Sequence, residues 1–175
     1  MRKTILVALI FIVSINYNNA QEKTFYSADF GAGLGLNYGG VGISLAFAPI
    51  SFLSIGGHLG YNFFSPTYGG EINLHIVPKN NNRIYGLALK SMYGYNTVHI
   101  VQGGNMDNKA FYGFNFGLSN ELRFGWSKRN GINIDIIFPI RSDEAIAYTD
   151  ELRDNGYETS SLTPVTISIG YHREF

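Results

Sequence analysis

Charged and imidazole side chains recur in this chain within stretches where apolar and polar residues alternate. On the polar side of those stretches stand Asp29, His58, Glu71, His75, Lys90, Glu121, Arg123, Asp135, His172 and Glu174. If these sides face one enclosed space, carboxylates and imidazoles could relay protons or ions, or form a catalytic His–acid set. They could equally neutralise one another as ion pairs, because an isolated buried charge is very costly.

We favour the ion-paired interpretation, since a narrow interior closed by strands leaves little room for an aqueous channel. The predicted network of interior charges consists of Asp29, Glu71, Lys90, Glu121, Arg123 and Asp135. In this network Lys90 and Arg123 provide the positive charge and the acidic residues surround them. The expected result is an interior filled by salt bridges.

Three more specific chemistries lack the residue spacing that they need. His58, His75 and His172 include no close-spaced ligand pair, so no metal site is predicted. No His-x-Ser pair occurs, so we expect no hydrolase or acyltransferase centre and no enzyme activity. The G-x-G-x-G run at 31–35 has the period of a strand and no helix pattern follows it, so no dinucleotide cofactor is expected.

The elements that would position these side chains are β-strands. Apolar residues occupy every second position, which is typical of a strand with one apolar and one polar face. The pattern is clearest at 111–126, where the even-numbered positions from 112 onward are all aromatic residues or leucines except Asn120. Eight strands are predicted, at 27–38, 41–48, 53–62, 70–77, 83–98, 111–126, 132–140 and 164–175. The chain is therefore predicted to be all-β.

The connections between these strands alternate in length. Three are short and polar or contain proline, at 49–52, 78–82 and 127–131. The others are a Gly-Gly hairpin at 39–40 and the stretches 63–68, 102–109 and 141–163. The last stretch contains a predicted short helix at 145–153, which Ser142-Asp143-Glu144 begins and Asn155-Gly156 ends. Short turns on one rim and longer loops on the other are typical of an up-and-down barrel in an outer membrane.

The last predicted strand carries Ile169, Tyr171 and Phe175 on its apolar side. This stretch resembles the C-terminal assembly signal of bacterial outer-membrane barrels, and the chain beyond residue 20 resembles small eight-stranded barrels of the OmpA/OmpX/OmpW type. The resemblance implies an eight-stranded antiparallel up-and-down transmembrane β-barrel with a short helix in its last extracellular loop. It also implies two partners, outer-membrane lipid and the barrel-assembly machinery, and a place in the outer membrane of a Gram-negative bacterium.

Residues 1–20 have the pattern of a cleaved secretory signal peptide. Arg2 and Lys3 precede an apolar run, and Ala20 offers a cleavage site. The remaining residues, 21–175, suit one barrel domain. Because residues 1–20 contain basic but no acidic side chains, this domain would be slightly acidic, and without a basic run no nucleic-acid partner is expected. The chain contains no cysteine, which excludes a disulfide framework.

The direction of the apolar faces decides between two kinds of barrel. In a membrane barrel they contact acyl chains, whereas in a secreted lipocalin-like barrel they surround a ligand. The polar faces are rich in Gly, Ala, Ser and Asn, which suit a narrow interior better than a solvated surface, so we favour the membrane barrel. Tyrosines and tryptophan near strand ends, Tyr38 and Trp126 among them, are expected at headgroup level.

The function expected from this pattern is structural or interactive at the cell surface, with a largely filled polar lumen. Two alternatives stay open, a narrow conduit for small or hydrophobic solutes and a secreted ligand-binding barrel. The long connection at 141–163 is acidic, but its residues do not identify an extracellular partner.

Overall fold

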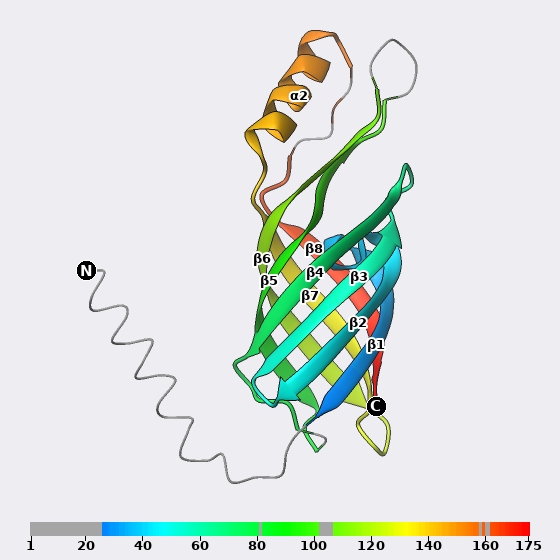
Figure 1. Ribbon diagram of the computed structural model, residues 1–175, viewed down its shortest axis with the longest axis vertical. Helices are drawn as coiled ribbons and strands as arrows, with labels where there is room; N and C mark the ends of the chain where they lie inside the picture. The colour runs from blue at the N-terminus through cyan, green and yellow to red at the C-terminus, as the bar shows by residue number, and fades with distance from the viewer. Residues whose placement is uncertain (1–25, 81, 102–106, 158, 160–161) are drawn as a thin grey trace, which may run out of the picture.

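The computed structural model describes residues 26–80, 82–101, 107–157, 159 and 162–175, and their strands form one closed barrel (Figure 1). The strands are β1 (Ser27–Gly35), β2 (Gly40–Ile50), β3 (Leu53–Tyr61), β4 (Pro66–His75), β5 (Tyr85–His99), β6 (Lys109–Phe124), β7 (Asn130–Pro139) and β8 (Thr166–Glu174). Each strand pairs antiparallel with the next, and β8 pairs with β1 to close the barrel. The prediction of an all-β chain with eight up-and-down strands is confirmed. The predicted signal peptide, 1–20, lies outside the described residues.

Side chains alternate between the interior of the barrel and its outer surface, as the period of two requires. Outward positions carry large apolar residues: Leu45, Leu59 and Phe114 are 62%, 63% and 57% exposed. Inward positions carry small or polar residues, such as Asn115 and Ser168, which are buried. The barrel is therefore polar inside and apolar outside.

The two ends of the barrel differ. At the lower end of Figure 1 lie the connections β2–β3, β4–β5 and β6–β7 and the C-terminus. We call this end the short-turn rim and define it by residues 50–53, 76–80, 82–85, 124–130 and 173–175. The other four connections lie at the opposite end, which we call the loop end. The grouping of the connections at the two ends agrees with the prediction, but their lengths do not alternate as predicted: β4–β5 at the short-turn rim spans the residues between His75 and Tyr85, whereas β3–β4 at the loop end spans only those between Tyr61 and Pro66.

At the loop end, β5 and β6 extend beyond the barrel as a two-stranded hairpin. The pairing of β6 with β7 stops at Asn115↔Pro139, whereas β5 and β6 remain paired to His99↔Lys109. Helix α2 (Asp143–Asp154) lies beside this hairpin and buries Tyr148 in a cluster with Phe111. The predicted helix at 145–153 is confirmed and is slightly longer, because the Ser142 side chain accepts a hydrogen bond from the backbone N–H of Ala145 and caps it.

The prediction for the end of the first strand is wrong. Residues Leu36–Tyr38 form a 3₁₀ turn, η1, whose three side chains are buried inside the barrel. Gly35 and Gly39, with φ of 120° and 65°, adopt backbone conformations that favour glycine and let the chain fold inward. Tyr38, expected at headgroup level, is instead 1% exposed and lies in the lumen.

Two strand boundaries also differ from the prediction. Strand β4 begins at Pro66, because the Asn62 side chain accepts hydrogen bonds from the backbone N–H groups of Phe64 and Ser65 and holds a tight turn after β3. The connection predicted at 63–68 is correspondingly shorter. Strand β6 ends at Phe124, so Trp126 lies in the β6–β7 turn. The connection predicted at 102–109 lies partly outside the described residues.

Candidate functional site: the charged lumen

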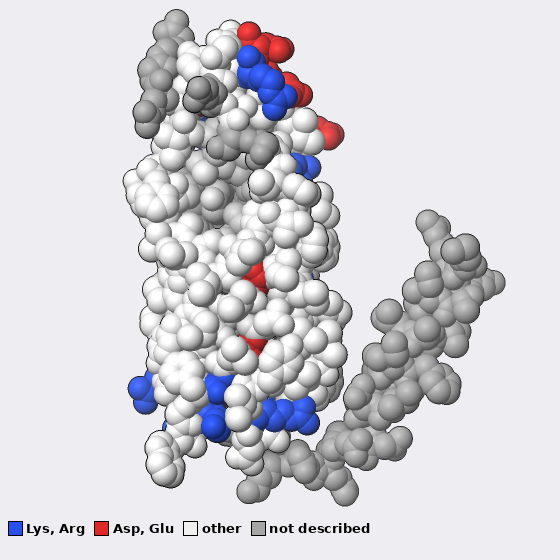
Figure 2. Space-filling view, turned by 180° about the vertical axis from the view of Figure 1, so that it is seen from behind, with Lys and Arg blue, Asp and Glu red and all other residues white. Residues whose placement is uncertain are grey.

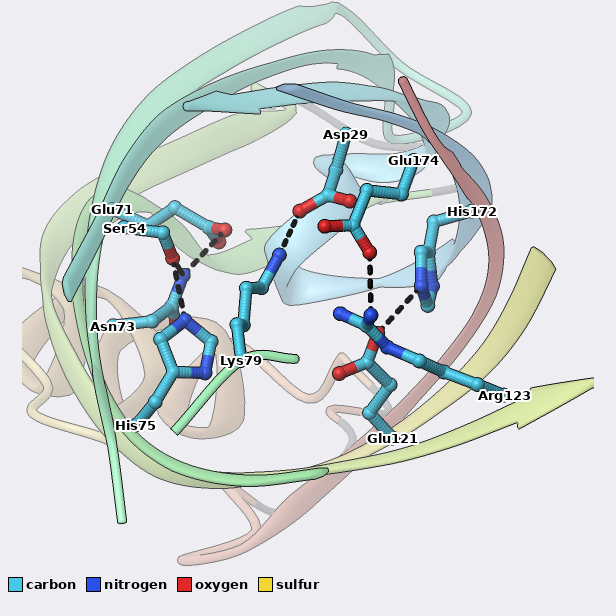
Figure 3. Close-up of polar contacts among 10 residues, drawn as sticks. All are labelled: Asp29, Ser54, Glu71, Asn73, His75, Lys79, Glu121, Arg123, His172 and Glu174. Carbon is cyan, nitrogen blue, oxygen red and sulfur yellow. Dashed lines mark hydrogen bonds and ion pairs between the residues drawn. The ribbon is translucent and has the colours of Figure 1, made fainter. Parts of the chain in front are cut away.

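All six residues of the predicted interior network occupy inward positions on the barrel wall. They are Asp29 on β1, Glu71 on β4, Lys90 on β5, Glu121 and Arg123 on β6, and Asp135 on β7. Their side chains are between 1% and 12% exposed. Figure 3 shows four of them, from β1, β4 and β6, pointing towards the axis of the barrel. The structure thus brings these residues into one lumen, where they form two clusters.

The first cluster, which we call the middle cluster, is centred on Lys90. Its Nζ lies 2.9 Å from Glu71 Oε2 and 3.2 Å from Asp135 Oδ2, so one ammonium bridges two carboxylates. Amide groups add two hydrogen bonds: Asn73 Nδ2 donates to Glu71 Oε1 at 3.1 Å and Asn37 Nδ2 donates to Asp135 Oδ2 at 2.5 Å. Asn37 belongs to η1, so the inward turn is tied to this cluster.

The second cluster, which we call the lower cluster, is centred on Arg123, which is one residue before the end of β6 and so lies nearer the short-turn rim. Figure 3 shows its members grouped around Arg123. Arg123 Nε donates to Glu121 Oε1 at 2.7 Å, and its Nη1 lies 2.5 Å from Glu174 Oε2. His172 Nε2 lies 2.7 Å from the same Glu121 oxygen. Two carboxylates thus offset the charge of the buried guanidinium, which would be very costly if it were isolated.

Two further polar contacts lie in the lumen beside these clusters. Lys79, from the β4–β5 connection, turns into the lumen and forms an ion pair with Asp29 on β1 (Figure 3). His75 Nε2 lies 3.0 Å from Ser54 Oγ, to which Asn73 Nδ2 donates at 3.3 Å. Because Asn73 also bonds Glu71, polar groups connect the level of His75 to the middle cluster.

A small cavity lies among these groups. It measures about 60 Å³ and is lined by residues of both clusters, including Lys90 and Glu121. A water molecule needs roughly 10–15 Å³ of such space, whereas ligand pockets occupy about 300–1,000 Å³. The cavity therefore has room for a few water molecules but not for an organic ligand.

The lumen carries more acidic than basic side chains. The described inward carboxylates are Asp29, Glu71, Glu121, Asp135 and Glu174, and the inward bases are Lys79, Lys90 and Arg123. With neutral histidines the interior is thus negative. The charged side chains of the lumen thus fill and order the interior by pairing with one another.

An apolar layer separates the charged clusters from the loop end. Met92 and Ile137 lie two residues beyond Lys90 and Asp135 towards that end, and they pack with Leu36 of η1. Met92 and Ile137 are 2% and 0% exposed. The polar interior is therefore covered on the loop side by buried hydrophobic side chains.

The ring of Tyr38 packs beside this layer against glycines of the barrel wall. A Cβ atom on Gly170 would overlap the Tyr38 ring, and one on Gly33 would lie 2.5 Å from it. These two glycines make room for an aromatic ring inside a barrel of eight strands. The inward turn and the glycine-rich wall are complementary shapes.

Several of these residues were not predicted as members of the network. Lys79 stands in a stretch read as a polar turn, and nothing local indicates that its side chain reaches Asp29. Glu174 and His172 lie on the polar face of the last predicted strand. That position could have indicated that they belong to the network of interior charges. Leu36 and Tyr38 gave no signal, because they keep the same alternation as the outward residues before them.

The histidines of the lumen lie apart from one another in the fold. His75 bonds Ser54, His172 contacts Glu121, and His58 is buried beside Gly69 and Gly94. Among the residues that the structure describes, no group of three or more His, Asp or Glu side chains is arranged to hold a metal ion. The expectations of no metal, no cofactor and no enzyme activity stay predictions.

The residues of the predicted assembly signal face outward. Ile169, Tyr171 and Phe175 are 49%, 46% and 67% exposed on the outer surface of β8 and its end. The backbone N–H of Phe175 donates to the carbonyl oxygen of Ala28 at 2.8 Å, so the pairing that closes the barrel continues to this residue.

The fold and its interior define a class of protein: a closed eight-stranded antiparallel β-barrel with an ion-paired lumen and an apolar outer surface. The chain matches no family model, no curated protein and no solved structure. In the part of the chain described, no helix is long and apolar enough to cross a membrane.

Proposed function

We propose that this chain is an integral outer-membrane β-barrel protein of a bacterium, exported by its signal peptide and inserted by the barrel-assembly machinery. Its role is structural or interactive at the cell surface, and it is not an enzyme. The observation that carries this proposal is the distribution of side chains, which is the reverse of that in a water-soluble domain.

The outer surface supports membrane insertion. Large apolar residues face outward on every strand, for example Phe47 on β2, Ile72 on β4 and Ile134 on β7, each more than 40% exposed. Soluble monomers rarely expose apolar patches of more than a few hundred Å². The strands are 9 to 16 residues long, and about 9–11 residues suffice to cross a bilayer at a tilt.

The interior supports a role without transport or catalysis. Ion pairs occupy the described lumen, the cavity among them is too small for an organic solute, and an apolar layer lies beneath the loop end. The part left for interaction is the loop end, where α2 and the β5–β6 hairpin stand above the barrel (Figure 1). An extracellular partner would contact these elements first.

A closed barrel of eight strands is also the architecture of secreted ligand-binding barrels, so the fold alone does not choose between them. A ligand-binding barrel holds its ligand in an apolar interior, whereas the described interior is filled by charges and amides. The contrast between the two faces is the reason for preferring the membrane.

Membrane extraction tests the proposal. We expect the protein to stay in the membrane fraction after a carbonate wash and to migrate faster on a gel before heating than after heating. A truncated chain without β8, which cannot close, is the control for the unheated form. Purified mature protein that stays monodisperse in buffer without detergent would contradict the proposal and favour the secreted barrel.

Conductance measurements in planar bilayers test the alternative of a narrow conduit. We expect inserted protein to give no discrete openings. Openings that disappear on Lys90→Ala or Arg123→Ala would favour the conduit, since their loss would show that the path depends on charges inside the lumen.

A further inference from the structure

Exposed charges are segregated between the two ends of the barrel. The exposed or half-buried basic side chains described at the short-turn rim are Arg83, Lys128, Arg129 and Arg173, whereas Lys79 turns into the lumen. The exposed acidic side chains of the described residues all lie at the loop end, namely Asp107, Asp143, Glu144, Asp150, Glu151 and Asp154. Figure 2 shows blue atoms gathered at the lower end, red and blue atoms at the upper end and a mostly white band between them.

The acidic side chains near the short-turn rim do not neutralise its exposed cations, because they turn into the lumen. Glu174 follows Arg173 directly but pairs with the buried Arg123, and Asp29 pairs with Lys79. The strand period places Arg173 outside and Glu174 inside. The rim therefore has a surplus of positive charge on its outer circumference.

Aromatic residues stand at the same level as these cations. Phe52, Phe124, Trp126 and Phe175 are exposed at or beside the three short turns and the C-terminus. The guanidinium of Arg173 lies over the Phe175 ring, 5.6 Å from its centroid. Aromatic rings with adjacent cations are typical of the interface between acyl chains and headgroups.

We propose that the short-turn rim binds the phosphates of anionic glycerophospholipid headgroups in the membrane leaflet that surrounds it. This inference rests on the proposed membrane function and adds a lipid class to it. Guanidinium groups donate two parallel hydrogen bonds to a phosphate, and each basic side chain near an anionic surface strengthens association several-fold. A zwitterionic headgroup has a phosphate but no net charge, so the rim favours lipids with a net negative charge.

The loop end has the opposite net charge, and this difference predicts at which rim anionic lipid is enriched. Around the six exposed acids of the loop end, the described basic side chains are Lys109, Arg141 and Arg153, and Arg153 pairs with Asp150 at 3.2 Å. This end is net negative and repels anionic headgroups. Enrichment of anionic lipid is therefore expected around one rim and not the other.

Trp126 makes the rim directly observable. It is the single tryptophan of the chain, it lies in the β6–β7 turn, and it is fully exposed. The protein is inserted into vesicles of phosphatidylcholine and phosphatidylglycerol in which one lipid at a time carries dibrominated acyl chains, which quench tryptophan fluorescence on contact. At equal mole fraction, we expect brominated phosphatidylglycerol to quench Trp126 several-fold more effectively than brominated phosphatidylcholine. The preference should decrease in high salt, because salt screens exposed charges.

Two variants connect the preference to the rim. Combined Arg83→Gln, Lys128→Gln and Arg129→Gln substitutions, which leave β8 and its assembly signal intact, should abolish the preference. The matched control, Lys109→Gln with Arg153→Gln, removes basic charge from the loop end and should leave it unchanged. Equal quenching by the two brominated lipids in the unmodified chain, or a preference that survives the triple substitution, would overturn the inference.

A relocated tryptophan separates failure of this inference from failure of the proposed membrane function. Trp126→Phe with Phe116→Trp moves the reporter to an outward position in the middle of β6. Quenching there by both lipids, without lipid quenching at Trp126 in the parent chain, would show an inserted barrel whose rim does not meet headgroups. Absence of quenching at both positions would contradict membrane insertion itself.

Discussion

Lys90 is the side chain on which the middle cluster depends. It is the basic partner of both Glu71 and Asp135, and none of the three has more than 9% of its side chain exposed. Removal of one partner from a buried ion pair leaves uncompensated charge, which costs about 3–5 kcal/mol. The amide donors Asn73 and Asn37 remain, so the loss is not expected to prevent folding.

Lys90→Met is therefore expected to lower the free energy of unfolding by about 3 kcal/mol, measured by urea titration of vesicle-inserted protein. Adding Glu71→Gln and Asp135→Asn to this variant should restore most of the loss, because the unpaired carboxylates are then gone. An unchanged midpoint for Lys90→Met alone would mean that the carboxylates of the lumen are hydrated rather than paired.

Gly170 tests the packing of the inward Tyr38 ring. A Cβ at this position overlaps the ring, so Gly170→Ala should destabilise the barrel by about 1–3 kcal/mol through overpacking. Gly70→Ala is the matched control, since the nearest atom to its Cβ is Gly56 O at 3.7 Å. Combining Gly170→Ala with Tyr38→Leu should recover part of the loss, and equal effects of the two alanines would argue against an inward Tyr38.

Strand β6 tests which face of the barrel meets lipid. Phe116 is outward and 48% exposed, and Phe116→Arg should cost about 2–4 kcal/mol near the membrane midplane. Gly117, one residue on, faces the lumen, where a Cβ meets the carbonyl oxygen of Ile136, so Gly117→Arg should fail by crowding. Urea titration and the yield of heat-modifiable barrel measure the two effects. Equal tolerance of both changes would mean that the face assignment is wrong.

Helix α2 is held on the β5–β6 hairpin by a histidine outside the barrel. His99 Nε2 lies 3.0 Å from Thr149 Oγ1, and its ring packs at the edge of Tyr148. Burial first, and then the positive charge of Arg141, lower the pKa of His99 from its ordinary value of 6.5. Lys109 pairs with His99 across the hairpin and adds another positive charge nearby.

The docking of α2 is therefore expected to weaken on acidification. The docked state prefers neutral His99, so the undocked state takes up a proton first as pH falls below about 6.5, and the contact loses stability. Protease cleavage of α2 in vesicle-inserted protein should be faster at about pH 5.5 than at about pH 7.5. His99→Gln retains a hydrogen-bonding group but does not titrate, so its cleavage ratio should be flat. A ratio unchanged by the substitution would exclude His99 as the cause.

The strands could be predicted from the sequence because a half-apolar strand repeats every two residues, and each of the eight does so. The inward turn η1 could not be predicted, because Leu36 and Tyr38 continue the two-residue alternation of the outward residue Leu34. In the sequence, an apolar residue that faces the lumen cannot be distinguished from an apolar residue that faces lipid. Lys79 could not be placed either, because its contact with Asp29 exists only after β1 and β8 have closed the barrel.

At the scale of the whole molecule, closure depends on the pairing of β8 with β1. Phe175 contributes its backbone bond to Ala28 and its outward ring. Deletion of Phe175 should impair assembly but leave export intact, which is read from the amounts of heat-modifiable and total exported protein. Phe175→Ala keeps the backbone bond and separates the contribution of the ring. Normal levels of folded barrel after deletion would contradict the assignment of an assembly signal.

The η1 turn, which fills part of the lumen, is continuous with the strands of the barrel wall. Because η1 joins β1 to β2 through two glycines, it has no free end, and it is held in place by Asn37 on Asp135 and by Tyr38 among the wall glycines. It cannot depart as a separate plug domain would. Any opening of the lumen must separate the paired residues of β1 and β2 that adjoin η1. Permeation of a solute would therefore carry the cost of partial unfolding and would be rare and brief.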